Sequence, residues 1–394
     1  MKKKVAIIGG GTGGLFLAAF LDTKLYDVTI YEKKSSLGRK FLVAGDGGFN
    51  LTHAEGLSSF KSRYTPRSFL DDALDHFSNV ALREWLQRLG IPTFVGSSGR
   101  IFPEKGIKPI EVLKLIEEYL TVKNVKFEFN KTFTGWDKDN NVTFDLKEII
   151  KSDYTVFALG GASWKVTGSD GSWLDIFSKK GISTLPFKAS NCAFKINWDE
   201  PFIKKYEGEP LKNISISLLD KTQKGEAVIT NFGLEGNAIY GLSPEIQASL
   251  VSKKEVVVYV DFKPTIDLST LREKIENSES NTTTTLKEKL KLPRSVVALI
   301  KTSLTKEEFL DIKVLAKFIK NIPLTITDSA PIDEAISTSG GINLNAVDSK
   351  FELKELTDNF CIGEMLDWDA PTGGYLIQAC ASTGAYLAHQ LNNK

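Results

Sequence analysis

The sequence predicts an α/β fold in which one domain is split by an insertion, and three features of the chain point to it. A buried strand, a glycine-rich turn, a helix and a second strand follow one another in residues 1–32. From about residue 187 the residue pattern changes. Short segments in which apolar and polar residues alternate, as in strands, are followed by charged, leucine-rich segments typical of helices. Glycine-rich sequence returns from about residue 328. We therefore expect residues 1–186 and 328–394 to form one domain, and residues 187–327 to form a β-rich and a small helical subdomain.

The opening unit has the residue types of a parallel βαβ arrangement. Lys4–Ile8 is an apolar run with β-branched residues, which suits a strand buried on both faces of a parallel sheet. Leu15–Leu21 is apolar all round, as a buried helix is. Asp27–Tyr31 has the composition of a second strand.

Helices, a loop and strands are expected in the rest of the first segment. Apolar residues at helical spacing predict amphipathic helices near residues 70–92 and 106–121, with a loop at Gly96–Pro103 between them. Val125–Phe129 and Val142–Leu146 are typical of strands in a small hairpin or meander. Tyr154–Leu159 is predicted as a buried strand that ends at two glycines.

The insertion and the tail have their own patterns. Ile214–Leu218 and Val256–Val260 alternate as half-buried strands do. Ile312–Ile319 has helical spacing, and the polar run Ser278–Thr285 predicts an exposed loop. The chain ends in an apolar helix expected near residues 375–391.

Composition narrows the classes of function. Formal net charge is +1, which gives no overall attraction to nucleic acid or to an anionic membrane. No stretch approaches the roughly 18 apolar residues that span a bilayer. The three cysteines are far apart in sequence, which disfavours a disulfide framework, a zinc ribbon and a dithiol centre. We expect a cytoplasmic protein with a small-molecule substrate, no metal, and no nucleic-acid or membrane partner.

The first glycine-rich turn matches the pattern GxGxxG at Gly9, Gly11 and Gly14. It follows a strand and opens a helix, which is the context that a dinucleotide-binding, Rossmann-like turn requires. Gly9 permits the tight turn, Gly11 lets the backbone approach a pyrophosphate, and Gly14 allows close packing of helix on strand. The helix then presents free N–H groups and a partial positive charge to the phosphates.

Glu32 supports the same interpretation. It lies 18 positions after Gly14, at the end of the second strand. A carboxylate there can accept hydrogen bonds from ribose hydroxyls and would repel a 2′-phosphate, which disfavours NADP at this site. The turn and the acid fit NAD and FAD alike.

The tail favours FAD. Gly363–Asp367 is followed by Gly373, Gly374 and Tyr375 at the start of the last helix. A helix N-terminus near the flavin ring would stabilise the anionic reduced form. The sequence has no second GxGxxG pattern, so no separate nicotinamide domain is visible.

Three features that follow Glu32 closely in the sequence are further candidates for the cofactor or substrate site. Gly38, Arg39 and Lys40 could pair with the pyrophosphate or the adenosine ribose, or form a solvated loop. The polar stretches Gly45–Gly48 and Asn50–Thr52 could face the flavin or the substrate, or merely connect elements. Beside them His53 is the histidine of most interest, although none of the three histidines has metal-ligand or triad spacing, and the pattern singles out no catalytic residue.

These motifs together resemble the BaiN-like, aminoacetone-oxidase-like family of FAD-binding flavoproteins, often described as NAD(P)/FAD-dependent oxidoreductases. The resemblance spans nearly the whole chain. It is carried by Gly9–Gly14 with Glu32, Gly38–His53, Phe94–Pro103, Leu159–Trp164, Gly168–Gly171, Ala330–Ser337, Gly340–Gly341 and Gly363–Tyr375. Gly48-Phe49-Asn50 stands where the broader family often carries Arg-Cys-Asn, which places the chain in a subgroup.

The resemblance implies a Rossmann-like FAD-binding domain, non-covalent FAD and an inserted middle. Motifs and resemblance together predict these cofactor-binding residues: Gly9, Gly11, Thr12, Gly13, Gly14, Glu32, Lys33, Gly38, Arg39, Lys40, Gly160, Gly161, Gly363, Glu364, Asp367, Gly373, Gly374 and Tyr375.

The leading functional hypothesis is an FAD-dependent oxidoreductase. Its flavin would exchange hydride with a small organic substrate or with NAD(P)H bound transiently as electron donor. Two alternatives are a non-catalytic flavin-binding redox sensor and an FAD-dependent RNA-modifying enzyme. A basic face on the inserted domain would favour the RNA-modifying enzyme.

Overall fold

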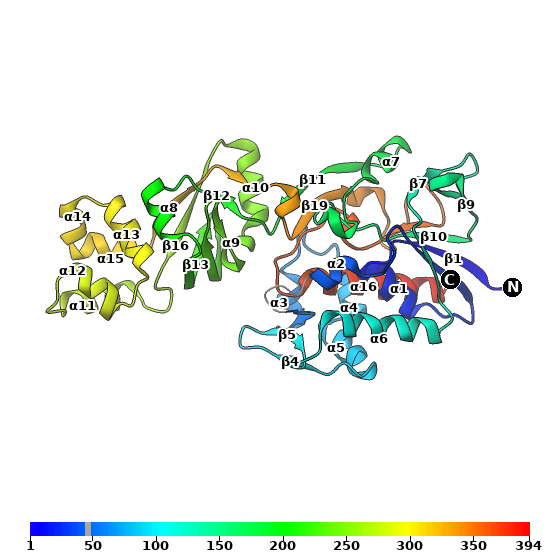
Figure 1. The fold of residues 1–394 in the computed structure, drawn as a ribbon, viewed down its shortest axis with the longest axis horizontal. Helices are drawn as coiled ribbons and strands as arrows, with labels where there is room; N and C mark the ends of the chain where they lie inside the picture. The colour runs from blue at the N-terminus through cyan, green and yellow to red at the C-terminus, as the bar shows by residue number, and fades with distance from the viewer. Residues whose placement is uncertain (44–48) are drawn as a thin grey trace. The chain divides into compact units, whose positions relative to one another are not determined.

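The computed structural model describes residues 1–43 and 49–394 and divides them into two compact units. Unit 1 contains residues Met1–Ala189 and Ile332–Lys394, and unit 2 contains Ser190–Pro331. The C-terminal segment therefore belongs to the same unit as the N-terminal one. Figure 1 shows the chain coloured from its N-terminus to its C-terminus.

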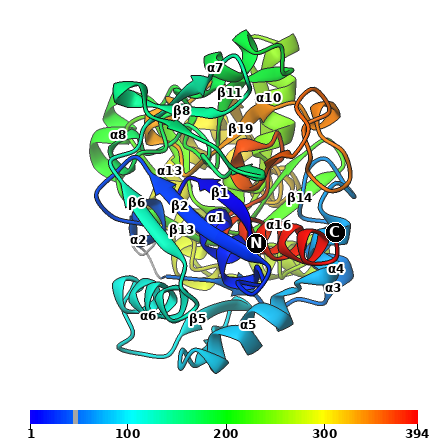
Figure 2. The same cartoon turned by 90° about the vertical axis from the view of Figure 1, so that its right-hand side faces the viewer.

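Unit 1 is built on a parallel sheet with strand order β20-β10-β1-β2-β6. The strands are β1 (Lys3–Ile8), β2 (Tyr26–Glu32), β6 (Lys126–Phe129), β10 (Tyr154–Phe157) and β20 (Asn359–Cys361). The central strand β1 places Val5 opposite both Tyr154 and Val28. Figure 2 shows β1, β2 and β6 side by side at the N-terminal end. The predicted α/β class and the opening βαβ unit are confirmed.

Residues 125–129 and 142–146 both contain strands, as expected, but the two strands do not belong to one small hairpin or meander. β6 pairs in parallel with β2, whereas β8 (Val142–Phe144) joins β7 (Phe133–Trp136) and β9 (Ile149–Ile150) in a separate antiparallel sheet. The partner of β6 lies about a hundred residues earlier in the chain. Local alternation cannot distinguish such a distant parallel partner from a neighbouring antiparallel one.

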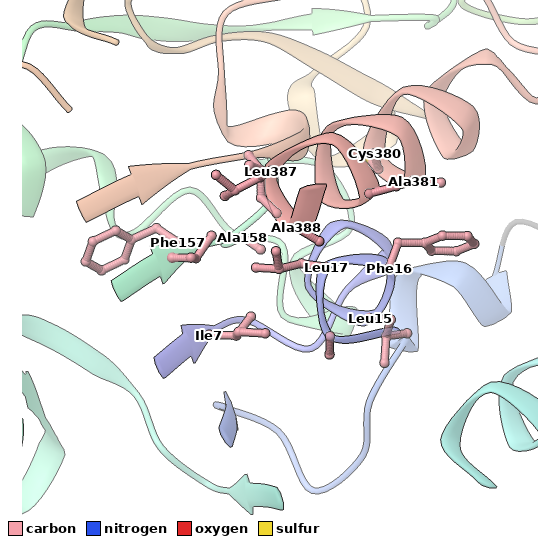
Figure 3. Close-up of a cluster of buried hydrophobic side chains, with 14 of the residues drawn as sticks. Ile7, Leu15, Phe16, Leu17, Phe157, Ala158, Cys380, Ala381, Leu387 and Ala388 are labelled. Atoms are coloured by element: carbon pink, nitrogen blue, oxygen red, sulfur yellow. The ribbon is translucent and has the colours of Figure 1, made fainter. Parts of the chain in front are cut away.

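Two helices pack against each other beside the sheet and hold the two ends of the chain together. They are α1 (Thr12–Phe20) and α16 (Tyr375–Asn392). Figure 3 shows Leu17 of α1 and Ala388 of α16 in their interface, and both side chains are fully buried. A Cβ on Gly384 would lie 2.6 Å from the Gly13 carbonyl oxygen, so the crossing depends on a glycine at that point.

The region of residues 70–103 differs from the prediction in two ways. The single helix expected at 70–92 is two helices, α4 (Asp71–His76) and α5 (Asn79–Arg88). The Ser78 hydroxyl accepts a hydrogen bond from the Ala81 N–H and so caps a new helix there. The expected loop at Gly96–Pro103 contains strand β5 (Arg100–Pro103), which pairs with β4 (Thr93–Val95) and β3 (Thr52–His53).

Unit 2 consists of an antiparallel sheet and a group of helices. The sheet has the order β17-β16-β13-β14-β15-β12-β18. The predicted strands at 214–218 and 256–260 lie in β13 (Pro210–Leu218) and β16 (Val256–Asp261). Its remaining strands are β12 (Phe194–Lys195), β14 (Lys221–Ile229), β15 (Gly233–Glu235), β17 (Ile322–Ile326) and β18 (Asp328–Ser329).

The helical group lies between β16 and β17 in sequence. It comprises α11 (Leu268–Glu276), α12 (Thr282–Thr284), a π-helical turn η3 (Thr285–Lys289), α13 (Arg294–Ser303), α14 (Lys306–Leu310) and α15 (Ile312–Ile319). α15 confirms the helix predicted at 312–319. The expected exposed loop at 278–285 is only partly a loop, because it contains α12 and the buried Thr285.

The other elements complete the two units. In unit 1 they are α2 (Arg39–Val43), α3 (Leu57–Lys61), α6 (Pro109–Val122), α7 (Leu174–Lys179), β11 (Thr184–Ser190), β19 (Ser337–Ile342) and the short 3₁₀ turns η1 (Asp145–Lys147), η2 (Lys165–Thr167), η4 (Ile332–Glu334), η5 (Leu344–Ala346) and η6 (Gly363–Met365). In unit 2 they are α8 (Glu200–Tyr206), α9 (Asn237–Tyr240) and α10 (Ser243–Ser252). Among the described residues, no helix is both long and apolar enough to cross a membrane.

Candidate cofactor site

A cavity of about 320 Å³ opens at the carboxyl ends of the parallel strands in unit 1. Ile8 of β1, Tyr31 of β2 and Ala158 after β10 all line it. In open α/β sheets this edge is where ligands bind, because loops from neighbouring strands diverge there. The predicted residues that line the cavity are Gly9, Gly11, Thr12, Gly13, Glu32, Lys33, Gly38, Arg39, Lys40, Gly160, Gly363 and Glu364.

The first glycine turn has the geometry that a phosphate-binding turn needs. Gly9 has φ +113, and a Cβ there would lie 2.3 Å from the Ala158 carbonyl oxygen. A Cβ on Gly14 would lie 2.2 Å from the Gly9 oxygen, so helix and strand pack too closely for a side chain. At Gly11, by contrast, no described atom outside its own neighbours in the chain lies within 4 Å of the Cβ position. The cavity beside Gly11 therefore leaves room for a ligand rather than for protein.

The same turn brings a helix N-terminus to the cavity. Gly11 is the N-cap of α1, no described side chain caps the helix, and its first turn contains no acidic residue. Gly11, Thr12 and Gly13 all line the cavity. The backbone N–H groups at this end and the helix dipole together favour an anion.

Glu32 is held in place by the backbone. One carboxylate oxygen accepts from the Gly10 N–H at 2.8 Å, and the other accepts from the Lys34 N–H at 2.8 Å. Each carboxylate oxygen has two acceptor positions, so both can still accept a bond from a hydroxyl. The side chain is therefore oriented by protein and remains able to bind a ribose.

The two cations of α2 differ in their surroundings. The Arg39 Nε is buried and has no hydrogen-bond partner among the described residues. A buried donor without a partner costs about 1–3 kcal/mol, so it indicates a place for an acceptor from outside the protein. Lys40 is already paired, because its Nζ lies 2.9 Å from a Glu364 carboxylate oxygen and 3.0 Å from the Ser163 hydroxyl.

Six predicted residues do not line the cavity. Gly14 and Gly161 lie in close packing, since a Cβ on Gly161 would meet the Thr338 hydroxyl at 2.3 Å. Asp367 accepts from the Gly340 N–H at 2.7 Å. Gly373, Gly374 and Tyr375 come directly before the residues of α16 that do line it, which are Leu376, Ile377 and Cys380. A cofactor contact from these six stays a prediction.

Tyr375 belongs instead to a polar cluster at the start of α16. Its hydroxyl lies 2.5 Å from a Glu55 carboxylate oxygen, and Glu55 also pairs with the Arg63 guanidinium at 2.8 Å. Burial alone would raise the pKa of Glu55, but the hydrogen bonds from Arg63 and Tyr375 hold that pKa below its usual range. Burial and the bond to Glu55 raise the pKa of Tyr375, so its phenol stays protonated.

His53 adjoins this cluster. Its ring stacks on the Tyr375 ring, with centroids 5.5 Å apart. Its Nδ1 accepts from the Glu55 N–H at 3.2 Å, so the proton of the neutral ring is on Nε2, which donates to the Ser98 carbonyl at 3.0 Å. From the neighbouring polar stretch, the Thr52 hydroxyl donates to Gln378 at 2.8 Å. The predicted stretch Gly45–Gly48 lies outside the described residues.

The structure also shows cavity residues that the motifs missed. Lys131, Thr132 and Phe133 line the cavity because they follow β6, whose place next to β2 the sequence did not reveal. Trp173 lines it too, and its indole N–H donates to the Gly160 carbonyl at 3.1 Å. Trp164 has a left-handed backbone with φ +65. The sequence signal that could have pointed to Trp164 is the glycine motif around residues 159–164.

Two further features of the site concern its thiol and the placement of potential metal ligands. Cys380 is a buried free thiol in the cavity wall, and burial raises its pKa, so it is protonated at neutral pH. Within residues 1–43 and 49–394, no group of three or more histidine, cysteine, aspartate or glutamate side chains is placed to hold a metal ion.

Comparison with known proteins places the chain among relatives of similar length. The family model described as HI0933-like protein Rossmann domain matches residues 3–390. A 3-dehydro-bile acid delta(4,6)-reductase of Clostridium scindens is 26% identical, over 98% of this chain and 98% of that protein. A ribosomal RNA dihydrouridine synthase of Haemophilus influenzae is 24% identical, over 94% of this chain and 94% of that protein. A ribosomal RNA dihydrouridine synthase of Escherichia coli is 22% identical, over 98% of this chain and 97% of that protein.

Proposed function

The chain belongs to the HI0933-like Rossmann family of FAD-dependent oxidoreductases, and from this premise we propose that it reduces a carbon–carbon double bond conjugated to a carbonyl group. When bound, FAD supplies the hydride that such a reduction requires. The single structural observation that carries the cofactor part of the proposal is the cavity at the strand edge, with space beside Gly11 and an unsatisfied Arg39 donor.

The described residues fit FAD by the chemistry of their donors and acceptors. The N-terminus of α1 and the Arg39 Nε would hold the pyrophosphate, and Glu32 would accept from the adenosine ribose. The ion pair between Lys40 and Glu364 ties α2 to η6 at the cavity wall. Phe41, Ile362, Leu376 and Ile377, which are among the apolar residues of the lining, would keep water from the ring.

The choice of reaction comes from what the relatives' names have in common. A delta(4,6)-reductase of a 3-dehydro-bile acid acts on double bonds in conjugation with a ketone. Dihydrouridine is uridine whose 5,6 double bond, conjugated to the C4 carbonyl, has been reduced. The carbonyl draws electron density from the far carbon of the double bond, so that carbon accepts hydride. The substrates differ greatly in size, but the bond reduced is of one type.

The experiment separates chemistry from cofactor binding. The FAD-loaded protein is reduced without oxygen by NADH or NADPH, which the proposal takes as electron donors, and the loss of flavin absorbance is followed. A cyclic conjugated ketone is then added, with the matched ketone carrying an isolated double bond as control. We expect only the conjugated compound to restore the flavin absorbance and to be recovered with two added hydrogens.

Two results would contradict the proposal. Equal reoxidation by both ketones would show that conjugation is irrelevant. Reoxidation by no acceptor other than oxygen would favour the alternative of a flavin-binding sensor without turnover. The second candidate function, an RNA-modifying reductase, uses the same bond type and is favoured by a surface of unit 2.

A further inference from the structure

The helical group of unit 2 carries a run of exposed cations that form no ion pair with any described acidic side chain. Lys287, Lys289, Lys291 and Arg294 are all exposed. Residues 287–294 contain these four cations and one acid, Glu288. The ion pairs formed by the described part of unit 2 lie elsewhere, at Lys221, Arg272 and Lys320. Four cations and one acid leave residues 287–294 with a net charge of +3, and none of the four cations is held in an ion pair by a described residue.

The backbone directs these side chains outward. In the π-helical turn η3, Thr285 and Leu286 are buried, as is Leu290 directly after it. The residues between them, 287–289, form the exposed arc of the turn. π-helical turns are rare and occur frequently at functional sites. The apolar residues of this turn thus fix its cations on the solvent side.

A fifth cation adjoins the run. Lys263, just after β16, has its pKa lowered by burial and by the positive charge of Lys291. Asp261, two residues earlier, forms an ion pair with Lys320, whose Nζ lies 2.6 Å from a carboxylate oxygen of Asp261. Like charges held near each other without a counter-ion favour an anion from outside the chain.

The helix that follows adds to the same field. α13 begins at Arg294, its N-cap is Pro293, and no side chain caps it. Its first turn contains no acidic residue. The N-terminal N–H groups and dipole of α13 therefore reinforce the positive potential at the end of the run.

We propose that these five cations, called here the basic segment (Lys263, Lys287, Lys289, Lys291 and Arg294), bind the phosphate backbone of an RNA that carries the substrate base. This inference rests on the proposed function, because a uracil 5,6 bond is a double bond conjugated to a carbonyl. Two relatives that align over almost the whole chain are named as acting on ribosomal RNA. Lysine and arginine contacts to phosphates hold a nucleic acid in position without reading its sequence.

The overall net charge of +1, which led to the expectation of no nucleic-acid partner, averages over the chain. It does not report a local imbalance of this kind. A small free substrate can contact only a few of these cations at once. A polyanion can contact each of them, and binding is favoured by the counterions that are released at each contact.

The test measures binding of a labelled, uridine-rich single-stranded RNA to the full-length, FAD-loaded protein. With about four phosphate contacts, affinity should fall about 50-fold between about 50 mM and 200 mM salt. The triple variant Lys287→Ala/Lys289→Ala/Lys291→Ala should bind at least about tenfold more weakly at low salt and lower the salt slope by about 2.

The matched control removes the same charge from the same helical group. Lys306, Lys313 and Lys317 are exposed lysines of α14 and α15, and the acids Glu307, Glu308 and Asp311 stand among them. Their triple alanine variant should change RNA affinity by less than about twofold. Equal loss in both triple variants, salt-insensitive binding, or binding to vesicles of anionic lipid but not to RNA would each overturn the proposal.

Failure of this inference is distinguishable from failure of the proposed function. Both triple variants leave the cavity of unit 1 untouched, so reduction of the conjugated ketone should proceed at the parent rate in each. Ketone reduction without RNA binding would remove the RNA inference and leave the reductase. RNA binding lost in the first triple variant alone, with no ketone or uridine reduced by any form of the protein, would remove the reductase and leave an RNA-binding surface.

Discussion

At the scale of single residues, the glycines of the first turn should tolerate substitution very differently. Gly11→Val places a side chain in open space beside the cavity, so we expect bound FAD to be lost while the free energy of unfolding of the FAD-free protein changes by less than about 0.5 kcal/mol. Gly14→Val would force a Cβ against the Gly9 oxygen and should prevent folding. Flavin absorbance after denaturation and urea unfolding measure the two effects. A Gly11→Val protein that stays fully yellow would contradict this placement of the pyrophosphate.

Arg39 offers a second test at this scale. Its buried Nε is a donor that awaits an acceptor, and hydrogen bonds to charged groups contribute about 1.5–3 kcal/mol. We expect Arg39→Met to weaken FAD binding by about 10- to 150-fold, as measured by titration of the FAD-free protein with FAD. Arg88→Met, an exposed arginine on α5, is the control and should leave the affinity unchanged. If the two variants bind FAD equally well, Arg39 does not contact the cofactor.

Glu55 predicts a pH dependence of stability. The pKa of Glu55 in the folded state is below the ordinary value. Ionised Glu55 therefore stabilises the fold at pH values above its unfolded-state pKa of about 4.3. This stabilisation is lost as the pH falls through the folded-state pKa. Glu55→Gln should therefore lower the free energy of unfolding at pH 7 by about 1–3 kcal/mol. The gap between parent and variant should close as the pH falls below about 4. Urea unfolding across this range measures the gap, with the exposed Glu84→Gln as the flat control. A gap that widens in acid would reverse the assigned sign.

At the scale of elements, the crossing of α1 and α16 joins the glycine turn to the tail. Gly384→Val would bring a Cβ within 2.7 Å of Leu17 N and should destabilise unit 1 by about 1–3 kcal/mol. FAD binding should weaken as well, because α1 carries the turn and α16 carries part of the cavity wall. Gln390→Val, on the same helix but partly exposed, controls for the β-branched side chain. Thermal unfolding with and without FAD measures both effects, and equal melting temperatures for the two variants would contradict the close crossing.

At the scale of the whole molecule, unit 2 is one continuous segment whose two ends meet. The Ala330 N–H donates to the Ala193 carbonyl at 2.9 Å, and Phe194 pairs with Ser329. Removing residues 194–329 and joining the ends with a short glycine–serine linker should therefore leave unit 1 able to fold and bind FAD. One FAD per chain, measured after denaturation, is the expected result. A folded but colourless product would mean that unit 2 contributes to the cofactor site.

The sequence by itself determined the features that depend on neighbouring residues. The opening βαβ unit, the tight turn at Gly9 and the close packing at Gly14 follow from spacing of a few residues and from the absence of a side chain. The last helix and the helix at Ile312–Ile319 follow from the periodic spacing of apolar residues. The change of residue pattern near residue 187 distinguishes the parallel α/β part of the chain from the β-rich part. In each case the signal is local, so residue types alone express it.

Only the tertiary structure decided the features that join distant segments. The parallel pairing of β6 with β2 brought Lys131–Phe133 to the cavity. The ion pair of Lys40 with Glu364 and the contact of Tyr375 with Glu55 span more than 300 residues. That the cations of the basic segment form no ion pair with a described residue appears only in the structure. Parallel pairing and side-chain contact depend on where the chain returns in space, and a local pattern does not record that return.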